Sequence, residues 1–140
     1  MAWTIEYFEK KDATVPAATW EDSIDPKLLG KLATFVKHIA ANEGRNCGNM
    51  FEKCHSQPGL FEVRAKTGKD LAREYCMRDG ERLVLLSGIV KPIDSPTPQS
   101  AFDEANANMQ EYKATKKVRA IVDEADRTEN EQAKQGEPGA

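Results

Sequence analysis

The 140-residue sequence is long enough for one domain with a single hydrophobic core, and its 39% hydrophobic and 31% charged residues are ordinary for a folded protein. No apolar run reaches the length of a membrane span, and residues 1–6 lack the basic start of a secretory signal, so we expect a cytoplasmic protein without a membrane partner. The net charge of −3 disfavours a general nucleic-acid-binding protein.

The cysteines do not suggest a special chemistry. There are 3 of them, Cys47, Cys54 and Cys76, and an odd number does not suit a disulfide scaffold. Cys47, Cys54 and His55 lie close together in the sequence, but their spacing differs from that of zinc modules and a fourth ligand is not evident. We therefore interpret the cysteines as incidental thiols and expect no metal site.

The charges are distributed unevenly along the chain. Residues 60–92 hold seven basic and five acidic residues, whereas residues 117–140 hold four basic and six acidic ones. A locally basic stretch inside a weakly acidic chain is more typical of a focused anion-binding site than of a broad basic surface.

The first part of the chain predicts one strand and one or two helices. Residues 3–8 alternate between polar and apolar side chains, which is typical of a strand. Asp25 as N-cap and Pro26 at the first helical position predict a helix with an apolar face, which ends near Gly44. Residues 45–55 are interpreted as a second, short helix.

The middle of the chain predicts an antiparallel meander, because three strand-like segments are separated by short turn signals. The last segment is almost continuously apolar, which indicates a central strand that is covered on both faces. In chain order, the predicted pieces are a strand over residues 60–65, a hairpin connection over 67–70, a return strand over 71–77, a turn at Asp79-Gly80 and a strand over 82–87.

The end of the chain predicts an irregular segment, a helix and a tail. Residues 91–98 contain three prolines and should be irregular, after which Thr97 before Pro98 caps a helix with an apolar face. We expect one domain over residues 1–116, and over 117–140 an extension of this helix followed by a disordered acidic tail from about Thr128. The fold class is α+β, with the helices on one face of a small, mostly antiparallel sheet.

This order of elements and several local strings resemble the RelE/ParE toxin superfamily, and within it the HigB-like branch, which is related to a phage protein. The resemblance covers residues 3–116. The matching strings are Trp-Thr-Ile-Glu-Tyr at 3–7, Gly-Leu-Phe-Glu-Val-Arg at 59–64, Arg-Glu-Tyr at 73–75, Leu-Val-Leu-Leu-Ser-Gly at 83–88, Lys91, Thr97-Pro98 and residues 105–112.

The resemblance implies a RelE-like fold and the toxin of a type II toxin–antitoxin system. Members with RNase activity bind in the ribosomal A site and cut the codon there. They need no metal or other cofactor, since the RNA's own 2′-hydroxyl attacks the adjacent phosphate while cationic side chains replace the histidine pair of ordinary ribonucleases. The implied partners are the ribosome, mRNA and an antitoxin, which in this branch commonly carries a helix-turn-helix.

The resemblance also implies the residues of the site. By position, Arg64, Lys66, Arg73 and Lys91 would be catalytic, and Lys69, Tyr75 and Tyr112 would contact the substrate. The chemistry suits these residue types, because the arginine fork matches phosphate oxygens and a lysine among other cations loses its proton more readily. Arg64 and Lys66 are two apart on one strand, as Arg73 and Tyr75 are on the next, so each pair shares a face.

Two departures from the family pattern keep other functions open. Ser87 stands where relatives often have histidine, and Pro92 where they often have a second basic residue, which thins the catalytic set. One alternative is a ParE-like protein that inhibits DNA gyrase by binding it, although such proteins generally lack the cationic set. The other alternative is a catalytically inactive, phage-derived binding protein.

A purely structural interpretation of the same residues also stays open. Arg64, Lys66 and Arg73 suit the solvated face of an antiparallel sheet, with Glu62 and Glu74 as ion-pair partners. Glu62 shares the alternation of Arg64 and would partly neutralise a phosphate site. In the same interpretation, Tyr75 and Tyr112 are packing residues and Lys91 is a loop charge.

Overall fold

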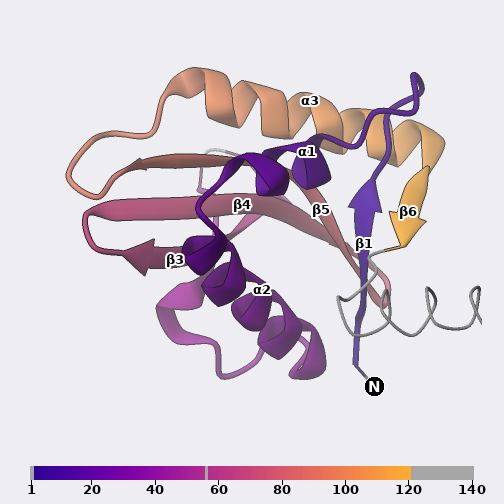
Figure 1. Cartoon of the computed structure of the whole chain (residues 1–140). Helices are drawn as coiled ribbons and strands as arrows, with labels where there is room; N and C mark the ends of the chain where they lie inside the picture. The colour runs from indigo at the N-terminus through magenta and orange to yellow at the C-terminus, as the bar shows by residue number, and fades with distance from the viewer. Residues whose placement is uncertain (1, 56, 121–140) are drawn as a thin grey trace, which may run out of the picture.

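The computed structural model describes residues 2–55 and 57–120, and in them confirms the predicted α+β fold (Figure 1). Six strands form one sheet in the order β2-β3-β4-β5-β1-β6, and every neighbouring pair is antiparallel except β1 and β5. The strands are β1 (Thr4–Phe8), β2 (Phe51–Lys53), β3 (Phe61–Thr67), β4 (Asp70–Asp79), β5 (Arg82–Pro92) and β6 (Val118–Ala120). The helices are α1 (Pro16–Ser23), α2 (Pro26–Ala41) and α3 (Gln99–Thr115), with a 3-10 turn at Gly48–Met50.

The helices cover both faces of the sheet, so the expectation that they lie on one face is wrong. Figure 1 shows α3 along one side of the sheet and α1 and α2 on the other. The reason lies in β5, where Leu83 and Leu85 pack under α1 and α2 while Val84 and Leu86 pack under α3. A strand that is apolar on both faces needs a cover on each. None of the described helices combines the length and apolar character that a bilayer span requires.

The start of α2 follows the predicted chemistry. One carboxylate oxygen of Asp25 accepts hydrogen bonds from the backbone N–H groups of Lys27 (3.1 Å) and Leu28 (3.2 Å), as an N-cap does. The preceding helix α1 was not predicted. It begins at Pro16 without a side-chain cap, and Ala17 is its one buried residue. The helix therefore lacks both a capping residue and an apolar face that would predict it from the sequence, despite the proline in its first turn.

Three other predicted segments differ from the structure. Residues 45–55 hold the 3-10 turn and strand β2 instead of a helix, because Phe51 pairs with Val63 at the sheet edge. Strand β5 continues through Pro92, so the irregular segment is shorter than expected. The last helix ends where Lys116 adopts a left-handed φ of 55°, and residues 118–120 form β6 rather than a helical extension. The tail predicted from Thr128 lies outside the described residues.

The meander has the predicted short turns. Gly68 (φ 55°) and Gly80 (φ 61°) supply the positive φ angles that allow β3, β4 and β5 to follow one another with two-residue connections. The pairing of β4 with β5 shifts between Tyr75 and Cys76, which places Leu86 in a β-bulge.

A buried acidic group lies on the α1 side of the sheet. Glu74 of β4 is completely buried, and burial followed by the adjacent Glu21 carboxyl of α1 raises its pKa well above the ordinary value. Glu21 in turn accepts a hydrogen bond of 2.6 Å from the hydroxyl of Tyr7. The contact between α1 and the sheet thus brings two carboxyl groups together, and the raised pKa of Glu74 favours its protonated form.

The contact between α1 and β5 predicts the effect of a substitution at Gly88. A Cβ atom there would clash with the ring of Trp20, so Gly88→Ala should lower the free energy of unfolding by about 1–3 kcal/mol. Gly30 of α2 has no atom within 4 Å of such a Cβ, and Gly30→Ala should raise stability by about 0.5–1 kcal/mol. Urea unfolding of both variants tests the contrast, and equal effects would contradict the packing described.

The protonated Glu74 predicts how stability depends on pH. Its pKa is raised in the folded state, so the folded protein binds a proton that the unfolded chain releases above its ordinary pKa of 4.5. The contribution of Glu74 to the free energy of unfolding is therefore fully present at pH 4. It falls as the pH rises, by up to about 1.4 kcal/mol per pH unit. In Glu74→Gln this part of the slope should vanish, which unfolding curves between pH 4 and 8 measure. Identical slopes in the two proteins would exclude a proton on Glu74.

Candidate functional site

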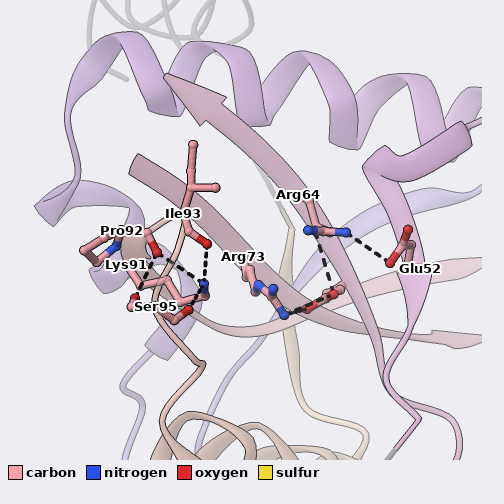
Figure 2. Close-up of polar contacts among 8 residues, drawn as sticks. Glu52, Arg64, Arg73, Lys91, Pro92, Ile93 and Ser95 are labelled. Carbon is pink, nitrogen blue, oxygen red and sulfur yellow. Dashed lines mark hydrogen bonds and ion pairs between the residues drawn. The ribbon is translucent and has the colours of Figure 1, made fainter. Parts of the chain in front are cut away.

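Two arginines face each other on the α3 side of the sheet. Arg64 of β3 pairs directly with Arg73 of β4, and Arg73 pairs with Ile89 of β5, which packs in the core under α3. Residues that are opposed in antiparallel strands point to the same face, so both guanidinium groups lie on that face (Figure 2). This juxtaposition is the one that the nuclease hypothesis requires.

Both guanidinium groups are held by carboxylates. Nη1 of Arg73 donates to the two oxygens of Glu62 at 3.4 and 3.2 Å, and Nη1 of Arg64 donates to Glu52 of β2 at 3.1 Å. Nε of Arg64 lies 4.0 Å from Glu62 as well. Glu62 therefore bridges the two arginines, and the ion-paired surface suggested by the structural interpretation is present for Glu62, whereas Glu74 points to the opposite face.

Glu62 is more buried than the arginines it binds. The exposed fraction of its side chain is 7%, against 19% for Arg73 and 29% for Arg64. Burial raises the pKa of Glu62, and the charges of Arg73 and then Arg64 oppose that rise. The carboxylate is thus a proton acceptor of higher affinity than an exposed glutamate.

Lys91 at the end of β5 brings a third cation to the same face. Its ammonium group donates to the backbone carbonyls of Pro92 (3.3 Å), Ile93 (3.5 Å) and Ser95, which Figure 2 shows gathered around it. Burial lowers the pKa of Lys91, and Arg73 and Arg64 lower it further by repulsion. The three carbonyls oppose the loss of its proton, so Lys91 contributes positive charge and fixes the segment that follows β5.

Tyr75 lies beneath this cluster rather than in it. Its side chain is completely buried, and its ring packs edge-on against Phe102 of α3, with 5.7 Å between centroids. Burial, followed by the charge of Glu62, raises the pKa of its hydroxyl. Ser87 is opposite Tyr75 on β5, and within the described residues neither hydroxyl has a hydrogen-bond partner.

The other predicted residues differ in how close they come to the cluster. Lys66 alternates with Arg64 on the same face and lines a second pocket with it, but its side chain is exposed near the end of β3, and Lys69 is exposed in the turn between β3 and β4. Tyr112 is completely buried, and its hydroxyl donates to Asp79 (2.7 Å) at the opposite end of β4 from Arg73. The structure therefore does not bring Tyr112 to the arginines.

A pocket of 390 Å³ opens beside Arg73, and sequence reasoning did not predict it. Arg73 and Glu62 line it together with six residues from other elements: Glu52, Lys53, Cys54 and His55 in β2 and just after it, and Gln99 and Phe102 in the first turns of α3. In the sequence, His55 was considered only as a possible metal ligand. The one lining residue that the sequence pattern could have placed beside the arginines is Glu62, because it alternates with Arg64 on β3.

No described group of three or more histidine, cysteine or acidic residues is arranged to hold a metal ion. The cysteines are free and buried, and burial raises the pKa of Cys54 to about 12, so its thiol is protonated at neutral pH. No family model matches the sequence, and a search of curated proteins gives no significant match. The candidate site therefore stands on its geometry and on the resemblance in the sequence.

The contacts of Lys91 predict that it orders the segment between β5 and α3. Lys91→Met removes three hydrogen bonds to carbonyls and should speed amide exchange over residues 93–98, with a loss of stability of about 1–3 kcal/mol. Lys69→Met, which removes an exposed lysine of the neighbouring turn, should change stability by less than about 0.5 kcal/mol. Unchanged exchange over residues 93–98 in Lys91→Met would exclude this role.

Proposed function

We propose that the chain is the toxin of a type II toxin–antitoxin pair and cleaves mRNA on the ribosome, with the RNA 2′-hydroxyl as nucleophile. One observation carries the proposal: Arg64 and Arg73 are opposed on adjacent strands, with Lys91 near enough for its pKa to respond to both. Paired guanidinium groups match the oxygens of a phosphodiester, and they keep their charge at every physiological pH.

The reaction needs three events, to which this face can contribute. The 2′-oxygen loses its proton and bonds to phosphorus, the phosphorane gains negative charge, and the 5′-oxygen leaves with a proton. The products are a 2′,3′-cyclic phosphate and a 5′-hydroxyl, so water and oxidants are not consumed. Cations that surround the phosphorane lower the barrier because they bind it more tightly than the ground-state diester.

Glu62 is the best proton acceptor for the first event. It bridges the arginines that would bind the phosphate, and its raised pKa improves its affinity for a proton. Lys91 suits that task less well, because three carbonyls hold its protonated form. His55 lines the same pocket and is a candidate to protonate the leaving oxygen.

The proposal is tested by mapping the 5′ ends of transcripts after expression from a tightly repressed promoter. Wild type should produce cuts confined to translated frames, with 5′-hydroxyl ends. Arg73→Gln should reduce the cutting by about 100-fold to 1,000-fold, because one donor to the phosphorane is lost. Arg78→Gln is the matched control: Arg78 is on β4 too, but stacks on Trp3 on the opposite face (5.0 Å), and its loss should leave cutting unchanged.

A second variant separates lost chemistry from lost folding. Arg73→Gln leaves Glu62 without its closest partner and so loses stability, whereas the double variant Arg73→Gln, Glu62→Gln removes both charges. The double variant should unfold at nearly the temperature of wild type and still fail to cut. Cutting that persists in a folded Arg73 variant would remove Arg73 from the site.

The inactive binding protein is the second candidate, and one observation favours it. Each guanidinium group already has a carboxylate partner, and Ser87 offers no acid or base group of suitable pKa. In the same expression experiment, normal growth with intact transcripts would support this candidate. Growth arrest with intact transcripts and DNA-damage signalling would instead support gyrase inhibition.

A further inference from the structure

The pocket beside Arg73 combines charged walls with an aromatic one. Phe102 is half-buried and lines the pocket, while Arg73 and Glu62 line another part of it. Its volume of 390 Å³ lies within the range of about 300–1,000 Å³ that is typical of small-ligand sites. A solvated charged surface does not need an aromatic wall, so the pocket suits a ligand that combines an anion with a flat apolar group.

Phe102 is held in one orientation from below. The ring of Tyr75 contacts it at 60° with 5.7 Å between centroids, and Tyr75 is itself completely buried. Ala101 and Ala105, on either side of Phe102 along α3, are buried against the sheet and fix the helix there. Phe102 is therefore a preorganised ring whose accessible part borders the pocket, which lowers the entropy cost of stacking on it.

Polar groups on the remaining walls suit the edge of a nucleobase. The imidazole of His55 and the amide of Gln99 line the pocket. The Gln99 nitrogen already donates to Asp103 (3.1 Å), and its oxygen can accept a hydrogen bond. Proteins that recognise single-stranded RNA combine these features: an aromatic ring for the face of an unstacked base, polar side chains for its edge and cations for its phosphate.

We infer that this pocket receives the unstacked base of the nucleotide adjoining the phosphate held at Arg73, with Phe102 as the stacking surface. The inference rests on the proposed function, because it takes the ligand of Arg73 to be an RNA phosphate. It adds a base-binding subsite to the arginine pair, and it explains why a partly exposed phenylalanine borders a charged cluster.

Binding of an uncleavable ligand tests the subsite without catalysis. The full chain is titrated calorimetrically with a 2′-O-methyl trinucleotide of adenosine, and with the same backbone lacking its bases. The trinucleotide should bind about 5-fold to 150-fold more tightly, which is the range for one base stacked on an aromatic ring. Phe102→Leu should largely abolish this difference, whereas Phe102→Trp, which keeps an aromatic face, should retain it.

The outcomes separate the subsite from the nuclease. Equal binding of the two ligands by wild type, a difference that survives in Phe102→Leu, or no binding of either ligand would each overturn the subsite. Transcript cutting in cells alongside any of these results would leave the nuclease standing and only the subsite lost. A base-dependent difference that requires Phe102, with intact transcripts in cells, would support the subsite and overturn the nuclease. Thermal unfolding of each variant verifies that it is folded.

Discussion

The structure on the α3 side depends on how two positive charges are accommodated at opposed positions of β3 and β4. Like charges directly across an antiparallel pair destabilise a sheet. Here Glu62 lies between Arg64 and Arg73, and Glu52 binds Arg64 from the next strand, so the repulsion is offset. These contacts occupy Nη1 of each guanidinium group, whereas the buried Nε atoms of Arg64 and Arg73 have no hydrogen-bond partner among the described residues. An anion that binds at this face has to compete with Glu62, which favours a strongly charged ligand that makes several contacts at once.

The position of Lys91 connects this electrostatic arrangement to the shape of the site. Its ammonium group holds the carbonyls of the chain just after β5, and that chain leads directly into α3. Phe102 and Gln99 stand in the first turns of α3. Lys91 therefore adds to the positive potential near Arg73. It also helps to position the start of α3, which carries the aromatic wall of the pocket.

Sequence patterns predicted the elements that have strong local signals. The Asp25-Pro26 start of α2, the turns at Gly68 and Gly80 and the two-sided burial of Leu83 to Leu86 all rest on nearest-neighbour chemistry. The segments that were predicted wrongly are strands that pair with an edge formed by another part of the chain. Residues 51–53 form a strand because the nearby β3 offers an edge, and residues 118–120 form one because the distant β1 does. The pattern of the segment itself does not show that such an edge is present.

The site shows the same division between local and distant signals. Alternation and the short hairpin were enough to place Arg64 opposite Arg73, since strand period and turn length fix the register. The helical spacing of Tyr112 fits either a core residue or a site residue. The direction of α3 relative to β4 decides between the two, because it places the Tyr112 hydroxyl against Asp79. The pocket is built from β2 and the residues after it, from β3, from β4 and from α3, so no local sequence motif predicts it.

The parallel pairing of β1 with β5 has a consequence for how the chain is made. Thr4 to Tyr7 pair with Arg82 to Leu85, and the other edge of β1 is covered by β6, so both neighbours of the first strand emerge from the ribosome long after it. Until β5 and β6 are synthesised, β1 has no strand partners, and the apolar side chain of Phe8 is exposed to water. Closing such a distant contact is slow compared with forming the β3-β4-β5 hairpins. Until those partners are made, β1 is therefore an unpaired strand that other chains could pair with.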